Sequence, residues 1–256
     1  TFSGAINGAY GLTVSTTNKS ITQSGVVGAT AAPTAVTFSA GTGNVTLGAA
    51  LTAQGQVSIT GGTLTLNSSI TSTATSGSGI ALNGRNIQQA AGTTVSTQGA
   101  DIAYLVTQAA FTSAADVMLG VGTVNGARTT INANGGHVSM GVSLATTGTA
   151  GGHDKVMQLR STDVLTSGAG TIALTSDATH NTSTLDVWAL DLWDARIQSA
   201  SGAITLSGTG GKASGNSRGI VSAGFGYSVL SESGDIRLVD TTPTGLTGNY
   251  LGMFLY

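Results

Sequence analysis

Gly202-Ala203-Ile204-Thr205-Leu206 decides the fold of this chain, because the same pattern recurs at a regular interval on both sides of it. Gly170–Leu174 precedes it and Gly234–Leu238 follows it at one constant interval, and Gly136–Met140 precedes Gly170–Leu174 at a slightly longer one. A constant period of about 20–50 residues is typical of stacked repeats, and alternate residues of a strand face one side. The pattern therefore predicts stacked strands whose Ile and Leu residues form two inward columns.

The remainder of each period also repeats, which predicts at least three strand segments in each turn. Val187-Trp188-Ala189-Leu190 precedes Gly219-Ile220-Val221-Ser222 by the same period, and Val156-Met157-Gln158-Leu159 precedes Val187 by nearly the same one. Gly, Ser and Asp separate the segments, and glycine suits corners because it has no Cβ. We expect one more inward column, formed by Met157, Trp188 and Ile220.

Charge divides the chain into two regions. Residues 1–100 contain no Asp or Glu and only Lys19 and Arg85 as basic residues, whereas all eleven acidic residues lie from Asp101 onward. The first region shows the same alternation with a looser period, in the pairs Val45/Leu47, Val57/Ile59, Leu64/Leu66 and Ile80/Leu82. We therefore predict an acid-free, loosely periodic β-repeat region over 1–100 and a β-solenoid with a period near 32 over 101–256.

Composition excludes several classes of protein. The chain is 40% apolar but only 8% charged, with a net charge of −2 and no cysteine, while about a quarter of a typical globular domain is charged. It has no basic stripe for nucleic acid and no apolar run of about 18 residues for a membrane helix. We expect an ordered all-β protein with almost no helix, no membrane span, no nucleic-acid partner and no cofactor.

The strand sequences also resemble those of a known class. Val45-Thr46-Leu47, Val57-Ser58-Ile59 and Ile204-Thr205-Leu206, with Asn-Gly and Ser-Gly corners, resemble the repeats of filamentous haemagglutinin-like exoproteins. These are large bacterial β-strand-repeat adhesins of the two-partner secretion or autotransporter type, and the opening Phe2–Val14 is similar to repeats of such proteins. The resemblance implies a right-handed parallel β-helix (β-solenoid), which the repeat lengths predict to have about ten turns, exported to the bacterial cell surface.

These expectations lead to a non-enzymatic function. We expect a rigid shaft within a large secreted adhesin or filament, which offers a surface for cell or matrix attachment. Thr1 opens within the pattern and Leu251–Tyr256 is apolar, so we expect both ends to be cuts in a longer chain. The expected partners are adjacent segments of that chain or other copies stacked end to end, with surface glycans as a further candidate. The alternatives are a self-assembling extracellular fibre subunit and a polysaccharide-active β-helix enzyme.

Two carboxylates are the candidates for the enzymatic alternative. The interval between Val156 and Val187, applied to this turn, places Asp163 one strand below Asp194, about 5 Å away, which is the separation of a retaining glycosidase pair. The simpler interpretation is a solvated corner, where Asp accepts hydrogen bonds from backbone N–H groups. The same interval aligns Arg160 with Asp191 and predicts an ion pair.

Trp193, Asp191 and Arg196 are the candidate binding residues. Trp193 faces outward if its strand is regular, and beside Asp191 and Arg196 it would form a platform for a sugar, whereas a packing role is the simpler interpretation. His137, His153 and His180 are scattered in the register, so we expect neither a His-based zinc site nor a catalytic triad. The glycine-rich nonapeptide of calcium-binding β-helices is absent, so no metal site is expected.

Overall fold

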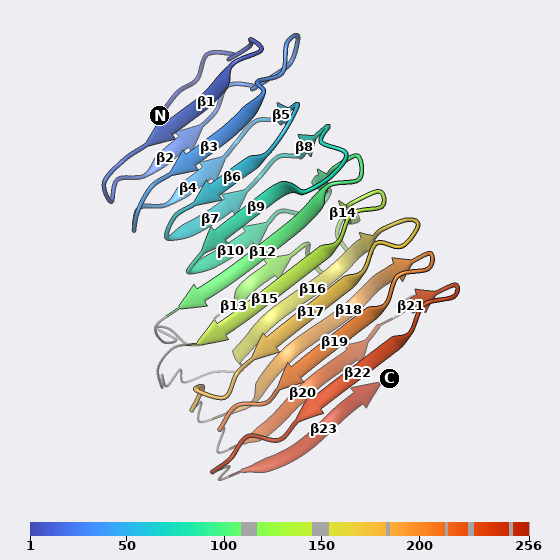
Figure 1. Cartoon of the computed structure of the whole chain (residues 1–256). Coiled ribbons are helices and arrows are strands. Elements are labelled where there is room, and N and C mark those ends of the chain that lie inside the picture. The colour runs from blue at the N-terminus through green and yellow to red at the C-terminus, as the bar shows by residue number, and fades with distance from the viewer. Residues whose placement is uncertain are drawn as a thin grey trace.

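The computed structural model describes residues 1–108, 117–144, 154–182, 185–212, 215–224, 228–245 and 248–255. None of these residues lies in a helix, so the described chain offers no helix that could cross a membrane. Their strands form a nine-stranded and a fourteen-stranded sheet, and the strands pair in parallel throughout (Figure 1). The all-β prediction is confirmed, and the arrangement is compatible with a β-solenoid.

The nine-stranded sheet follows the chain from one end to the other. Each of its strands pairs with the next one of its kind, so that the strands form a ladder between the two termini (Figure 1). In order, the strands are β1 (Gly11–Ser15), β3 (Ala35–Ser39), β6 (Val57–Thr60), β9 (Ser78–Gly84), β12 (Asp101–Gln108), β15 (Val138–Leu144), β17 (Ile172–Asp177), β19 (Ile204–Thr209) and β22 (Ile236–Thr241).

The fourteen-stranded sheet has two arms that join in its long strands. The first arm contains β2 (Ile21–Gln23), β4 (Val45–Leu47), β7 (Thr63–Leu66), β10 (Asn86–Gln89) and β13 (Val117–Val121). The second arm contains β5 (Leu51–Ala53), β8 (Ile70–Ser72), β11 (Thr94–Ser96) and β14 (Thr129–Asn132). Both arms pair with β16 (Asp154–Leu165), and the sheet continues through β18 (Val187–Ser199), β20 (Asn216–Ala223), β21 (Ser228–Ser231) and β23 (Asn249–Leu255).

The long strands bend where the two arms meet. The first half of β16 pairs with β13 and its second half pairs with β14. Between the halves, Ser161 has a φ of 44°, and Asp194 has a φ of 52° at the equivalent place in β18. A residue in the left-handed region changes the direction of the backbone. The turns that contain β16 and β18 therefore have three strand segments each, where the sequence predicted at least three.

One inward column runs through the whole nine-stranded sheet. It consists of Leu12, Val36, Val57, Ile80, Ile102, Val138, Ile172, Ile204 and Ile236, each paired with the next. These residues follow one another at intervals of 21–24 up to Ile102, and then at 36, 34, 32 and 32. Ile172, Ile204 and Ile236 thus pair at an interval of 32 residues, and the turns in the first hundred residues are shorter.

The predicted column of Met157, Trp188 and Ile220 is wrong. Met157 pairs with Leu190, which pairs with Ile220, while Trp188 pairs with Lys155 and Arg218. The reason is a break in the alternation, because Val156 and Met157 are both fully buried, as are the equivalent Ala189 and Leu190. Two consecutive buried residues place Trp188 on the outer side of the strand, and the pairing of β16 with β18 is shifted by two positions from the predicted one.

Candidate functional site

Trp188 lies between two cations on the outer face of the long strands that continue the first arm. Lys155, Trp188 and Arg218 occupy one register position on β16, β18 and β20. The Lys155 Nζ atom lies 4.6 Å from the centre of the Trp188 ring, and the Arg218 Cζ atom lies 5.2 Å from it. Cations at these distances are attracted to the face of an indole ring. The arrangement therefore joins three adjacent strands through side chains as well as through the backbone.

Asp191 is the buried acid of the same surface. Only 1% of its surface is exposed, and its Oδ2 atom accepts a hydrogen bond of 2.9 Å from Gln158 Nε2. Lys155 Nζ lies 3.6 Å and Arg160 Nη2 lies 3.5 Å from Oδ2. The predicted Arg160–Asp191 ion pair is therefore present. The register behind the prediction is wrong, because Asp191 aligns with Gln158 and Arg160 aligns with Trp193.

Trp193 is the exposed aromatic residue of this surface. It lies outward at the end of the first half of β18, and 37% of its surface is exposed. Arg160 is its register neighbour on β16, and Ala223 is its neighbour on β20. The small side chain of Ala223 leaves more room beside the indole than another large residue would. Trp193 can therefore offer part of its ring to a ligand, whereas Asp191 beside it is enclosed.

The predicted alignment of Asp163 with Asp194 is wrong, because Asp163 aligns with Arg196. Arg128 lies between the two acids instead. Its guanidinium donates to Asp163 Oδ1 from Nη2 at 2.6 Å and from Nε at 3.1 Å, and to Asp194 Oδ2 from Nη1 at 3.1 Å. The hydrogen bond to Asp163 is the main reason why the pKa of Arg128 is raised. Both carboxylates thus belong to one ion-pair network around Arg128.

Arg196 lies apart from the other predicted binding residues. It follows the bend at Asp194 and aligns with Asp163 in the strand register, so it lies on the half of β18 that continues the second arm. There it lines a shallow pocket of about 200 Å³. The other lining residues are Asn132, Asn134, Leu165, Thr166, Ser167 and Gln198. The structure therefore places Trp193 and Asp191 together on the first half of β18, and Arg196 on its second half beyond the bend at Asp194.

His137 takes part in local contacts, whereas the buried Nδ1 atom of His180 has no hydrogen-bond partner within the part of the chain that the structure describes. His137 Nδ1 lies 2.8 Å from Thr171 Oγ1, and the His137 backbone N–H donates to Asp101 Oδ1 at 2.8 Å. His153 lies outside the described residues. Among the described residues, no three His, Cys, Asp or Glu side chains gather as metal ligands.

Sequence reasoning missed Lys155, Arg218 and Arg128, the three cations that organise this surface. The positions of Lys155 and Arg218 depend on how β16 pairs with β18 and how β18 pairs with β20, and these two pairings have unequal offsets along the chain. The signal was the pair of adjacent apolar residues in Val156-Met157, which breaks the alternation.

A scan of protein-family models, a search of curated proteins and a search of solved structures each found no match to this chain.

Proposed function

We propose that this chain is a right-handed parallel β-helix of about ten turns that acts as a rigid structural segment of a large bacterial surface protein of the adhesin or filament type. The observation that carries the proposal is the inward column from Leu12 to Ile236, which is continuous over nine strands. Parallel strands stacked in this way are stiff along the stack because each turn is hydrogen-bonded to two neighbours. The export to the cell surface rests on the resemblance of the repeats.

A structural role also agrees with the acidic residues. Asp163 and Asp194 are both bound by Arg128, and Asp191 is bound by Lys155 and Arg160. A polysaccharide-cleaving pair needs two carboxyl groups that face one substrate. The ion pairs use these groups to connect neighbouring turns, which favours the shaft over the enzyme.

Electron microscopy of the purified chain tests the proposal. At about 4.8 Å for each strand spacing, about ten turns correspond to a rod of about 50 Å. We expect short, uniform rods of this length at low concentration. Round or flexible particles would contradict the shaft. Long filaments that grow with concentration would instead favour the self-assembling fibre subunit.

Attachment to a surface glycan is a second proposed role, supported by the exposed ring of Trp193 beside Arg160. Aromatic rings with one exposed face are suited to stack against the apolar face of a sugar. Titration of the chain with an acidic oligosaccharide such as trigalacturonate, followed by tryptophan fluorescence, tests the role. The response should disappear in Trp193→Phe and persist in Trp188→Phe, and a response that is equal in both variants would exclude Trp193 as the contact.

A further inference from the structure

A shallow pocket lies on the outer face of the stack, on the side formed by the second arm. Residues of β14, β16 and β18 and of the corners that follow β14 and β16 line it. These strands have paired neighbours on both sides, since β14 also pairs with β11 and β18 also pairs with β21. The pocket volume of about 200 Å³ is below the roughly 300–1,000 Å³ that is usual for drug-sized ligands. The pocket therefore suits a ligand the size of a single sugar ring.

Leu165 is the apolar residue of the pocket, and an amide side chain lies on each side of it. Leu165 aligns with Asn132 on β14 and with Gln198 on β18. Each neighbour is one strand spacing away, so the two amide residues are about 10 Å apart at the backbone. That width accommodates a pyranose ring with its hydroxyl groups. A pyranose also has an apolar face of C–H groups, which can lie on Leu165 while the hydroxyl groups at its rim meet the amides.

Hydrogen-bond donors remain available in the pocket. Asn132 Oδ1 accepts a hydrogen bond of 3.0 Å from the Asn134 backbone N–H, while the Asn132 Nδ2 group has no partner among the residues that the structure describes. Asn134 Nδ2 donates to the Thr97 carbonyl oxygen at 2.6 Å, which fixes this second amide at the rim. The side chain of Gln198 makes no hydrogen bond within the described chain. The amides on both sides of Leu165 can therefore donate to the hydroxyl oxygens of a sugar.

Arg196 adds a positive charge to the pocket. Its side chain is exposed and makes no ion pair or hydrogen bond with the described residues. Asp163 is its register neighbour on β16, but Arg128 already binds both Asp163 and Asp194. Ser228, its register neighbour on β21, is small and uncharged. A guanidinium whose N–H groups are unpaired binds a carboxylate through two parallel hydrogen bonds, so the pocket favours a ligand that carries this group.

We propose that this pocket binds a sugar that carries a carboxylate, such as a hexuronic acid residue of an acidic polysaccharide. Arg196 binds the carboxylate, the apolar face of the ring lies on Leu165, and Asn132 and Gln198 donate to the hydroxyl groups. The site goes beyond the proposed shaft, and it is separate from the surface of Trp193, which lies on the first half of β18 before the bend.

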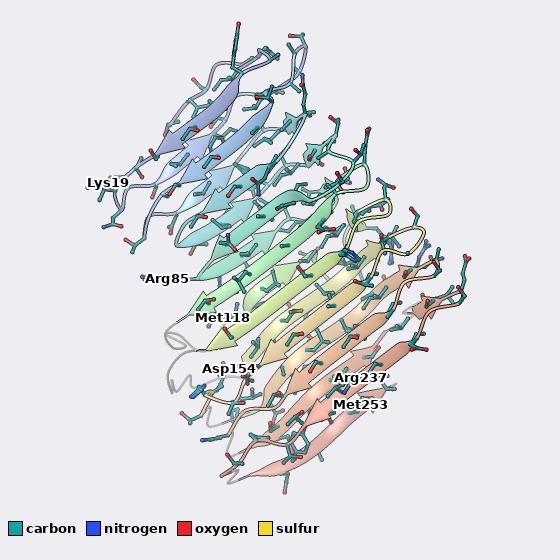
Figure 2. The ribbon with its side chains drawn as sticks, viewed as in Figure 1. Lys19, Arg85, Met118, Asp154, Arg237 and Met253 are labelled. Atoms are coloured by element: carbon teal, nitrogen blue, oxygen red, sulfur yellow. The ribbon has the colours of Figure 1, made fainter. Side chains whose placement is uncertain are left out.

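Saturation-transfer NMR titrations of the whole chain test the site, with methyl galacturonide as the probe. We expect saturable binding that is at least about tenfold tighter than that of methyl galactoside, because hydrogen bonds to a charged group are the stronger ones. Arg196→Gln should reduce the binding of the galacturonide to the level of the galactoside. Arg237→Gln is the matched control and should leave binding unchanged, because Arg237 is an exposed arginine on β22 of the other sheet (Figure 2). Circular dichroism should show both variants folded, since both side chains are exposed.

Acetate separates the carboxylate from the ring, and it should bind at least about tenfold more weakly than methyl galacturonide. Equal binding of acetate would overturn the proposal and leave a simple anion site. The absence of saturable galacturonide binding, or binding that survives Arg196→Gln, would overturn it as well. Trp193→Phe should leave this binding unchanged, and a loss in that variant would assign the sugar to the other surface instead. None of these readouts depends on particle shape in microscopy, so the pocket and the shaft are tested separately.

Discussion

Ile204 and Ile236 occupy consecutive positions of one inward column, but Ile204 is fully buried whereas 45% of Ile236 is exposed. The cost of removing a side chain depends on the apolar contacts it loses. We expect Ile204→Ala to lower the free energy of unfolding by about 2–5 kcal/mol and Ile236→Ala by less than about 1 kcal/mol. Chemical denaturation of the two variants measures the difference. Equal losses would mean that the last strand is covered in solution.

Gly202 should tolerate no larger side chain. An added Cβ overlaps the Gly170 carbonyl oxygen, so Gly202→Ala should push two adjacent strands apart and cost at least about 2–3 kcal/mol. Gly11→Ala is the matched control, because no atom lies within 4 Å of a Cβ at that position. Thermal unfolding of both variants provides the comparison, and an unchanged melting temperature for Gly202→Ala would contradict the tight corner.

Loss of the Asp191 charge should leave two cations without their acid. Lys155 and Arg160 both contact the buried Oδ2 atom, and their side chains are 21% and 24% exposed. Removing one partner of a completely buried ion pair lowers the free energy of unfolding by about 3–5 kcal/mol. Because both cations are partly exposed, we expect Asp191→Asn to lower it by about 2–3 kcal/mol. Asp235→Asn on the exposed final turn is the control. A loss no larger than that of an exposed ion pair, about 0.5 kcal/mol, would show that the pairs contribute little.

The Arg128 network should respond to salt. Arg128 is partly exposed and bridges Asp163 and Asp194, so Arg128→Gln should cost roughly 1 kcal/mol at low ionic strength. Most of that cost should disappear in 1 M NaCl, where the screening length falls to about 3 Å. Arg237→Gln, at an exposed arginine of β22, provides the comparison. A cost that does not depend on salt would indicate packing rather than charge.

Alkaline pH should destabilise the chain through Tyr104. This side chain is fully buried, burial raises its pKa, and its hydroxyl donates to Gln89 Oε1 at 2.7 Å. Unfolded tyrosine ionises near pH 10. The folded state holds the proton more tightly, so this stability is complete below about pH 10 and is lost as the pH rises further. Tyr104→Phe should reduce the loss between about pH 10 and 11 in denaturation midpoints, although Tyr250, whose pKa is also raised, keeps its own contribution.

The strands of the nine-stranded sheet were predictable because their spacing is regular. Ile172, Ile204 and Ile236 pair as the constant interval requires. In β17 and β19 buried and more exposed residues alternate, so period and register carry the same information there. The division at residue 100 remains a prediction about domains, since both sheets contain strands from both sides of it.

The surface of β16 and β18 was less predictable. Its register depends on consecutive buried residues and on connections of unequal length, and neither follows from a repeat period. A shift of two positions separates Asp163 from Asp194 in the register. The consecutive buried residues Ala189 and Leu190 place Trp188 on the outer side. Arg128, which binds both acids, lies 35 and 66 residues from them in the sequence.

The turn length changes after Ile102, so the two parts of the stack should respond differently to force. The termini lie at opposite ends of the stack (Figure 1), so tension applied to them would peel the strands away one turn at a time. Turns of 21–24 residues would then lengthen the chain by roughly 70–85 Å each, and turns of 32–36 residues by roughly 105–130 Å. When a single molecule is stretched, the size of each extension step would therefore report which region of the stack has unfolded.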